Sequence, residues 1–99
     1  MGKQVYSMWK ARPTAAFLQL SKEEQDQYWA GLRERHEKAG VKSIVVLDTH
    51  WSTEQWYFAG VAEYQDIDAL RRFERMQQEA NVALYFASEH MLGTKMEES

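Results

Sequence analysis

The sequence predicts a single α+β domain whose elements follow one another in the order βαββαβ. The chain has 99 residues, a length that suits one domain with one hydrophobic core. Four segments rich in β-branched and aromatic residues alternate with two segments that carry helix start signals. Hydrophobic residues make up 44% of the chain and aromatic residues 13%, which excludes a disordered chain. We therefore expect one domain over residues 1–99, ending in a polar tail from about residue 94.

The first strand is predicted over residues 3–10, because this segment is rich in β-branched and aromatic side chains and is closed by Pro13. Large side chains alternate on both of its faces, with Val5 and Trp9 on one and Tyr6 and Met8 on the other. A strand that is apolar on both sides is typical of the middle of a sheet covered on both faces. The apolar connector over residues 14–20 should fold back over the edge of the core through Phe17, Leu18 and Leu20.

A capping box predicts where the first helix begins. The Ser21 hydroxyl and the Glu24 carboxylate stand three residues apart, so each can accept a hydrogen bond from the other residue's backbone N–H. The helix should run to about Lys38, because Gly40 can adopt the left-handed conformation that ends helices. At helical spacing one apolar arc collects Tyr28, Trp29, Leu32, His36 and Ala39. For His36 on this arc we expect an imidazole packed at the edge of the core.

The second half of the chain predicts a hairpin, a helix and a last strand. Strands are expected over residues 41–49 and 55–64, joined by a loop of two to five residues. Asp66 can cap a helix over residues 67–80, whose inner face holds Ala69, Leu70, Phe73, Met76 and Ala80. Asn81 should end this helix, and the fourth strand is expected over residues 83–91.

This element order predicts the split βαβ, or ferredoxin-like, arrangement, with a four-stranded antiparallel sheet and both helices on one face. In any register the strands also place large apolar residues on the other face. Two copies of the sheet could cover each other and leave a cavity between them. We therefore expect a homodimer.

The sequence resembles the dimeric α/β-barrel superfamily over nearly its whole length, in element order and size. It is similar in particular to members whose first strand ends in Trp-Lys, here Trp9 and Lys10, before a connector that contains proline. These members then begin a helix with Leu-Ser-x-Glu-Glu, which corresponds to residues 20–24. The superfamily includes antibiotic-biosynthesis monooxygenases, EthD-like and YCII-like proteins, muconolactone-type isomerases, polyketide cyclases and haem-degrading enzymes. The resemblance implies a homodimer forming an α/β barrel, with a cavity for a small molecule.

Asp48 and His50 are the candidate catalytic residues. They stand two apart at the end of the second predicted strand, so they should share a face. A carboxylate beside an imidazole raises its basicity, as a general base requires. Strand ends are also commonly polar because they meet solvent, and side chains two apart on a strand lie about 7 Å from each other.

Aromatic side chains predict the walls of a pocket for a small aromatic or polyketide-like ligand. The candidate substrate-binding residues are Tyr6, Trp9, Trp56, Tyr57 and His90. His90 could face the ligand, or it could be a core or interface histidine. The expected chemistry is cofactor-free acid/base catalysis of the isomerase, cyclase or monooxygenase type. The alternative is a dimer without catalytic activity, whose aromatic residues serve packing and self-association.

Several functional classes are disfavoured by composition. The net charge of −3, with no basic block, argues against nucleic-acid binding. The chain has no cysteine, and its three histidines lack metal-ligand spacing, so we expect no metal site. Haem binding is a third possibility, because some members of the superfamily use a histidine of the second helix, but residues 67–80 hold none. No apolar run is long enough for a membrane span or a signal peptide, so we expect a cytoplasmic protein.

Overall fold

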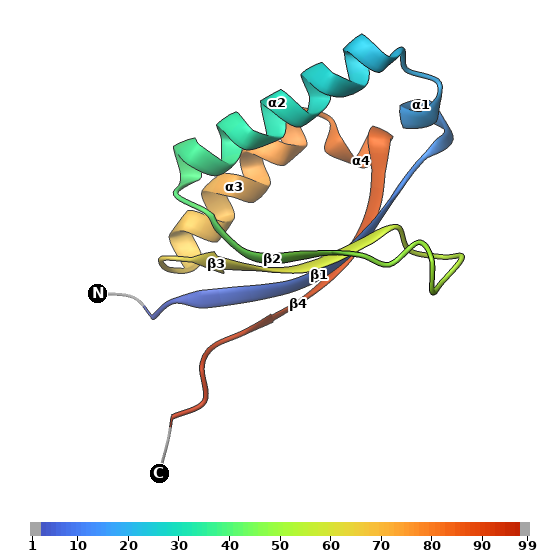
Figure 1. Cartoon of the computed structure of the whole chain (residues 1–99). Helices are drawn as coiled ribbons and strands as arrows, with labels where there is room; N and C mark the ends of the chain where they lie inside the picture. Colours follow the sequence, from blue (N-terminus) through green and yellow to red (C-terminus); the bar gives the residue numbers. More distant parts are fainter. Residues whose placement is uncertain (1–2, 98–99) are drawn as a thin grey trace.

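Four strands and two long helices form two layers in the computed structural model, which describes residues 3–97. The elements are β1 (Val5–Pro13), α1 (Ala15–Leu18), α2 (Lys22–Ala39), β2 (Lys42–Asp48), β3 (Phe58–Tyr64), α3 (Ile67–Glu79), α4 (Val82–Tyr85) and β4 (Phe86–Gly93). The strands make one antiparallel sheet in the order β2-β3-β1-β4. Both long helices cover the same side of this sheet (Figure 1). The α+β class and the four-stranded antiparallel sheet are therefore confirmed, and the arrangement is compatible with a ferredoxin-like fold.

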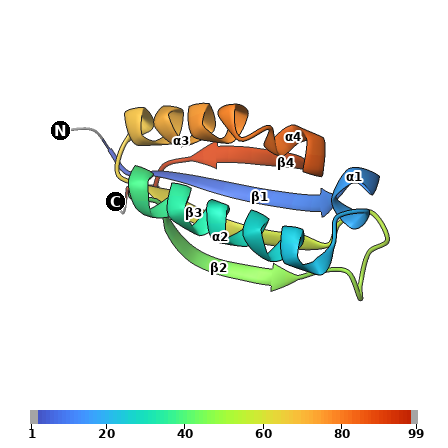
Figure 2. The same cartoon turned by 90° about the horizontal axis from the view of Figure 1, so that it is seen from above.

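Strand β1 lies in the interior of the sheet, paired with β3 on one side and β4 on the other. Its side chains alternate between the two faces. Val5 and Trp9 point to the helix side, where their cross-strand partners are Tyr64 and Gly60. Seen from above, α2 crosses over the sheet while α3 lies on the β4 side (Figure 2). The opposite face of the sheet carries no helix, and we call it the helix-free face.

Local capping signals set the ends of both long helices. The backbone N–H of Ser21 donates to Glu24 Oε1 (2.9 Å), and the N–H of Glu24 donates to Ser21 Oγ (3.1 Å). Gly40 ends α2 in the left-handed conformation, with φ of 68°. At the start of α3, Asp66 Oδ1 accepts the N–H of Ala69 (2.8 Å). These predicted starts and ends hold to within one residue.

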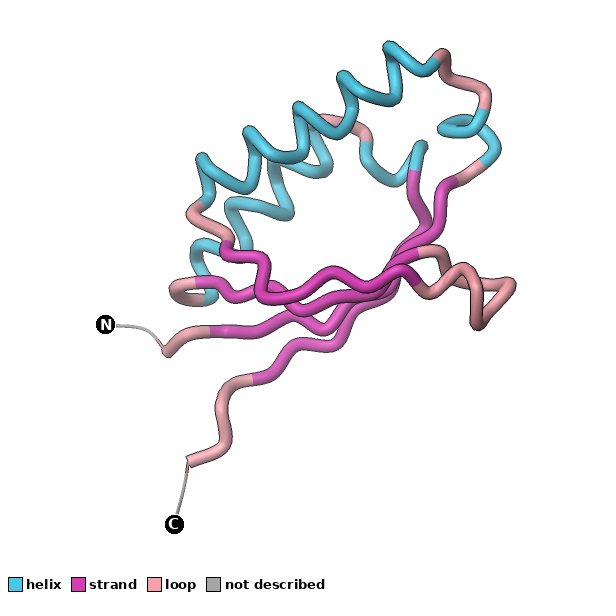
Figure 3. The backbone as a smooth tube through the Cα atoms, viewed as in Figure 1, coloured by secondary structure: helices cyan, strands magenta, loops and turns pink. Residues whose placement is uncertain are grey.

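The loop between β2 and β3 is longer than the two to five residues predicted, because β3 begins at Phe58 and not at residue 55. The loop spans residues 49–57 and projects from one end of the sheet (Figure 3). The carbonyl of Thr49 accepts the N–H groups of Ser52 (3.0 Å) and Thr53 (3.1 Å), which closes a turn directly after β2. Trp56 and Tyr57 therefore belong to the loop, although their aromatic character is typical of a strand.

The end of β1, the connector after it and the start of β4 also differ from the prediction. Strand β1 continues to Pro13, which can pair at a strand end because its missing N–H is not needed there. The connector after it holds the one-turn helix α1, in which Phe17 is buried but Leu18 is 57% exposed. The fourth strand begins at Phe86, because the residues after Asn81 first form the short helix α4. Residues 98 and 99 of the predicted tail lie outside the described part of the chain.

The core between sheet and helices has two parts. One part consists of Val5, Ala39, Ala62, Tyr64, Ala69, Leu70 and Phe73, with Trp9, Leu32, Val41 and Met76 packed against it. The other is an aromatic cluster centred on Phe86, whose ring meets those of Phe17, Tyr28 and Trp29. Together the two parts anchor both long helices on the sheet.

Gly60 allows the Trp9 ring to pack closely against β3. A Cβ atom at this position would come within 2.7 Å of the Trp9 ring and 2.5 Å of the Val45 carbonyl oxygen. We therefore expect Gly60→Ala to lower the free energy of unfolding by about 1–3 kcal/mol, the usual cost of overpacking. Urea denaturation measures this change, with Gly93→Ala as the control, because nothing lies within 4 Å of a Cβ atom there. Equal losses in the two variants would contradict the close packing at Gly60.

His36 lies at the edge of the core, with its ring 5.0 Å from that of Phe73. Burial lowers the pKa of His36, and the positive charge of Arg35 lowers it further. Below the unfolded-state pKa of about 6.5, the unfolded chain binds a proton that the folded chain resists, so stability falls with falling pH. Urea denaturation between pH 8 and pH 5 should show a smaller decrease for His36→Gln than for the native protein. An identical decrease in both would contradict this role of His36.

Within residues 3–97, the helices are too short or too polar to cross a membrane.

Candidate functional site

The helix-free face of the sheet is apolar across its centre. Met8 of β1 pairs with Val61 of β3 and with Met91 of β4, so the three side chains form a row across the sheet. Val45 and Leu47 of the edge strand β2 continue the row, because they pair with Val61 and Ala59. Met91 is 64% exposed and Met8 47%. We call Met8, Val45, Leu47, Val61 and Met91 the apolar row.

At the loop end of this face, two cations lie against one tryptophan. Lys10 Nζ is 4.9 Å from the centre of the Trp56 ring, and the Arg12 guanidinium carbon is 5.2 Å from it. Lys10 and Arg12 stand two apart on β1, so the alternation of the strand places both on the side of Met8. Trp56 is held in turn by its carbonyl, which accepts the hydroxyl of Thr49 (3.0 Å).

Tyr57, the residue after Trp56, adds a second aromatic contact to this group. The ring of His50 stacks on that of Tyr57, with centroids 4.0 Å apart and planes 15° from parallel. The N–H of Tyr57 donates to the carbonyl of Ala11 (3.0 Å), which ties this part of the loop to β1. Three of the predicted site residues, His50, Trp56 and Tyr57, thus come together on one loop. We call these three with Lys10 and Arg12 the loop-end cluster.

Asp48 contacts the backbone of His50. Its Oδ1 accepts the backbone N–H of His50 (3.0 Å), which is a typical local turn contact. The imidazole ring of His50 is positioned by Tyr57 through stacking. Both Asp48 and His50 are exposed in the single chain. The hydrogen bond of Asp48 therefore reaches the main chain of His50, while the imidazole contacts Tyr57.

The two cations of the loop-end cluster differ in their partners. Lys10 Nζ forms an ion pair with Glu89 Oε2 of β4 (3.4 Å). Arg12 is half-buried, and within residues 3–97 it has no carboxylate oxygen within 4.0 Å. Among these residues, the contact that the structure gives for its guanidinium is with the face of Trp56.

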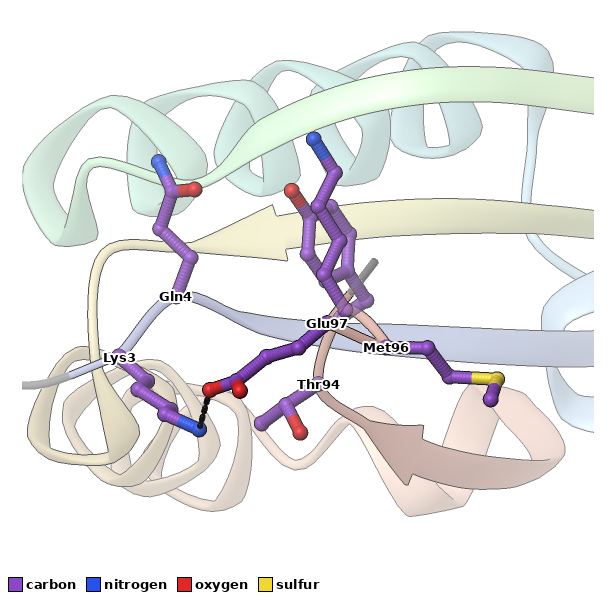
Figure 4. Close-up of a pocket in the computed structure, with 7 residues that line it drawn as sticks. Lys3, Gln4, Thr94, Met96 and Glu97 are labelled. Carbon is purple, nitrogen blue, oxygen red and sulfur yellow. Dashed lines mark ion pairs between the residues drawn. The ribbon is translucent and has the colours of Figure 1, made fainter. Parts of the chain in front are cut away.

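Tyr6 lies at the other end of the helix-free face. Its hydroxyl donates to Glu63 Oε1 on the neighbouring strand (2.7 Å). This hydrogen bond raises the pKa of Tyr6, and desolvation and the negative charge of Glu63 add to the effect. A hollow of about 230 Å³ opens beside Tyr6, lined by Lys3, Gln4 and residues 94–97. Figure 4 shows the ion pair between Lys3 Nζ and Glu97 Oε1 (3.6 Å) that closes one side of it.

Trp9 and His90 lie on the helix side of the sheet. They are cross-strand partners of each other, and Trp9 packs against the buried core. His90 Nε2 is 4.0 Å from Glu74 Oε1 of α3. A pocket on the helix-free face therefore excludes these two residues. Of the other predicted substrate-binding residues, Tyr6 lies on that face, and Trp56 and Tyr57 belong to the loop-end cluster at its end.

Another hollow, of about 280 Å³, lies on the helix side between Tyr28, Tyr85 and the start of α2. Deeper in the helix layer, Arg35 Nε donates to Gln77 Oε1 of α3 (2.6 Å). Arg35 Nη2 is buried, and the described residues offer it no hydrogen-bond partner. The residues that line this hollow do not belong to the loop-end cluster.

Lys10, Arg12 and Glu63 contact predicted site residues but were not themselves predicted to belong to the site. Lys10 and Arg12 carried a usable signal, because two cations spaced by two on a strand must share a face. Their contact with Trp56 could not be predicted, since it depends on the path of the long loop.

No protein-family model matches the chain, and a search of curated proteins finds no match either. Among residues 3–97, no three His, Asp or Glu side chains gather in a way that could hold a metal ion. What the site can do therefore follows from its own side chains, which offer aromatic surface, two cations and one exposed imidazole at the edge of an apolar sheet.

Proposed function

We propose that two copies of this chain pair through the helix-free face and enclose a pocket that binds a small planar, hydrophobic molecule. The observation that carries the proposal is the apolar row, in which Met8 of the interior strand β1 and Met91 of the edge strand β4 stand exposed side by side. Large exposed apolar patches on a folded chain are typical of interaction surfaces.

The exposed area of the single chain supports a second copy as the cover. The chain exposes 7364 Å². A monomeric protein of 11.7 kDa is expected to expose about 5,900 Å². The excess of about 1,500 Å² includes the extended segment at residues 94–97, and it exceeds the roughly 800 Å² that each partner buries in a typical stable interface. A symmetric dimer is the commonest way for a chain to cover such a face with its own surface.

The loop-end cluster supports a planar ligand. Trp56 and Tyr57 are half-buried and His50 is exposed, so a flat molecule can stack on their aromatic surface and bury its own. In the pairing that we propose, the centre of each sheet is covered by the partner, and the ligand occupies the space beside it at the loop end.

Acid/base chemistry in this pocket would fall to His50. Its ring is exposed and is oriented by stacking on Tyr57, while Asp48 fixes the backbone of the turn. A neutral imidazole there can take a proton from a phenol or an activated carbon and return it to a neighbouring atom, as isomerases and cyclases require. On a substrate identified for the protein, full turnover by His50→Ala would overturn this assignment.

Calorimetric titration with 2-naphthamide, a neutral planar probe, tests the binding pocket. We expect binding to the native dimer and a loss of about tenfold or more in affinity for Trp56→Ala, because stacking on Trp56 is removed. The matched control is Trp51→Ala, since Trp51 belongs to the same loop but is 83% exposed. Absence of binding, or an equal loss in both variants, would contradict the proposed pocket.

A further inference from the structure

We infer that the pocket selects planar molecules that carry a carboxylate or another delocalised anion, and that Arg12 is the residue that binds the anionic group. This inference rests on the proposed function and specifies its ligand class. A planar ring would stack against Trp56 while its anionic edge meets the guanidinium of Arg12.

The placement of the two cations supports an anion at this position. Both Lys10 and Arg12 lie against one ring, Trp56, at 4.9 Å and 5.2 Å from its centre. A ring face attracts a cation through its quadrupole and offers no conventional hydrogen-bond acceptor. The N–H donors of such a cation therefore stay available to other groups. A flat anion that stacks near Trp56 would therefore meet donors that are already in place.

The balance of charge points to Arg12 within this pair. Lys10 already pairs with Glu89, whose Oε2 lies 3.4 Å from Lys10 Nζ. Arg12 is half-buried and, in the part of the chain that the structure describes, forms no ion pair. A guanidinium binds a carboxylate through two parallel N–H donors, which a lysine cannot do, so it recognises a planar carboxylate by shape as well as by charge.

The acidic groups near the loop-end cluster are accounted for. Glu89 is engaged by Lys10, and Asp48 accepts the backbone N–H of His50. Glu54 lies on the exposed outer part of the loop. A ligand anion at Arg12 would therefore face one unpaired cation, and covering by the second copy would strengthen this attraction by excluding water.

A comparison of two matched probes tests the inference. In calorimetric titrations, we expect 2-naphthoate to bind the native dimer about tenfold more tightly than 2-naphthamide, because only the naphthoate offers a charged acceptor pair. Arg12→Gln should remove this preference, so that the two probes bind this variant with equal affinity. Arg12→Lys should retain only part of it. The control is Arg33→Gln, which removes an exposed arginine of α2 and should change neither affinity.

The other possible results separate a failure of this inference from a failure of the proposed function. If both probes bind the native dimer equally, the pocket does not select anions and the inference is wrong, while the proposed function stands. If neither probe binds, the proposed function and the inference both fail. If Arg12→Gln converts the dimer to monomer in sedimentation, Arg12 pairs with the second copy and not with a ligand, which also overturns the inference.

Discussion

Replacing Phe86 with alanine should lower the free energy of unfolding by about 3–5 kcal/mol, the usual cost of removing a buried phenylalanine ring. Phe86 is 8% exposed and lies at the start of β4. Its ring centre is 4.8 Å from that of Phe17 and 5.4 Å from those of Tyr28 and Trp29. The loss should be large because this one ring joins α1 and α2 to the sheet.

Urea denaturation at a fixed protein concentration measures the effect of Phe86→Ala, since dimerisation would make stability depend on concentration. Leu84→Ala is the control, because Leu84 is 51% exposed in the neighbouring helix α4. It should cost less than about 1 kcal/mol. A Phe86→Ala variant as stable as Leu84→Ala would show that the aromatic cluster does not hold these elements together.

Met8→Glu should weaken the proposed dimer by a factor of about 100 or more. Met8 lies at the centre of the apolar row, so a two-fold axis would place two glutamates against apolar surface. Burying an unpaired charge costs several kcal/mol, and each 1.4 kcal/mol corresponds to about tenfold in affinity. In the single chain Met8 is 47% exposed, so the variant should keep its secondary structure.

Sedimentation velocity over a range of concentrations measures this change, and circular dichroism checks the fold of Met8→Glu. Leu18→Glu is the matched control, because Leu18 is 57% exposed but belongs to α1 and not to the apolar row. We expect Leu18→Glu to sediment like the native protein. Identical behaviour of the two variants would show that the helix-free face is not the interface.

The elements that could be predicted from the sequence are those set by local signals. The Ser21–Glu24 capping box, Gly40 and Asp66 act within a few residues of themselves, so their effect does not depend on the rest of the fold. The class of the fold follows from the order of these elements. The dimer and the barrel that the resemblance implies stay predictions.

The elements that were predicted wrongly depend on tertiary contacts. Trp56 and Tyr57 resemble strand residues, but they contact Lys10, Arg12 and His50 and lie in a loop. Residues 83–85 also resemble a strand, yet they form a helical turn after Asn81, whose φ is 60°. Propensity is a weak guide where such contacts decide the conformation.

The candidate site could be predicted only in part for a related reason. Strand alternation correctly separates Tyr6 from Trp9, but β1 is apolar on both sides, so the pattern does not say which side the helices cover. Both residues were therefore candidates for one pocket, although they lie on opposite faces. The neighbours of His50 depend on the turn at Thr49, which strand alternation does not describe.

The mass of the native protein in solution tests the central claim most directly. Sedimentation equilibrium at micromolar concentration should give one species of twice the 11.7 kDa chain mass. A stable species of 11.7 kDa under these conditions would mean that the apolar row needs no second copy, and it would contradict the proposed pocket between two sheets.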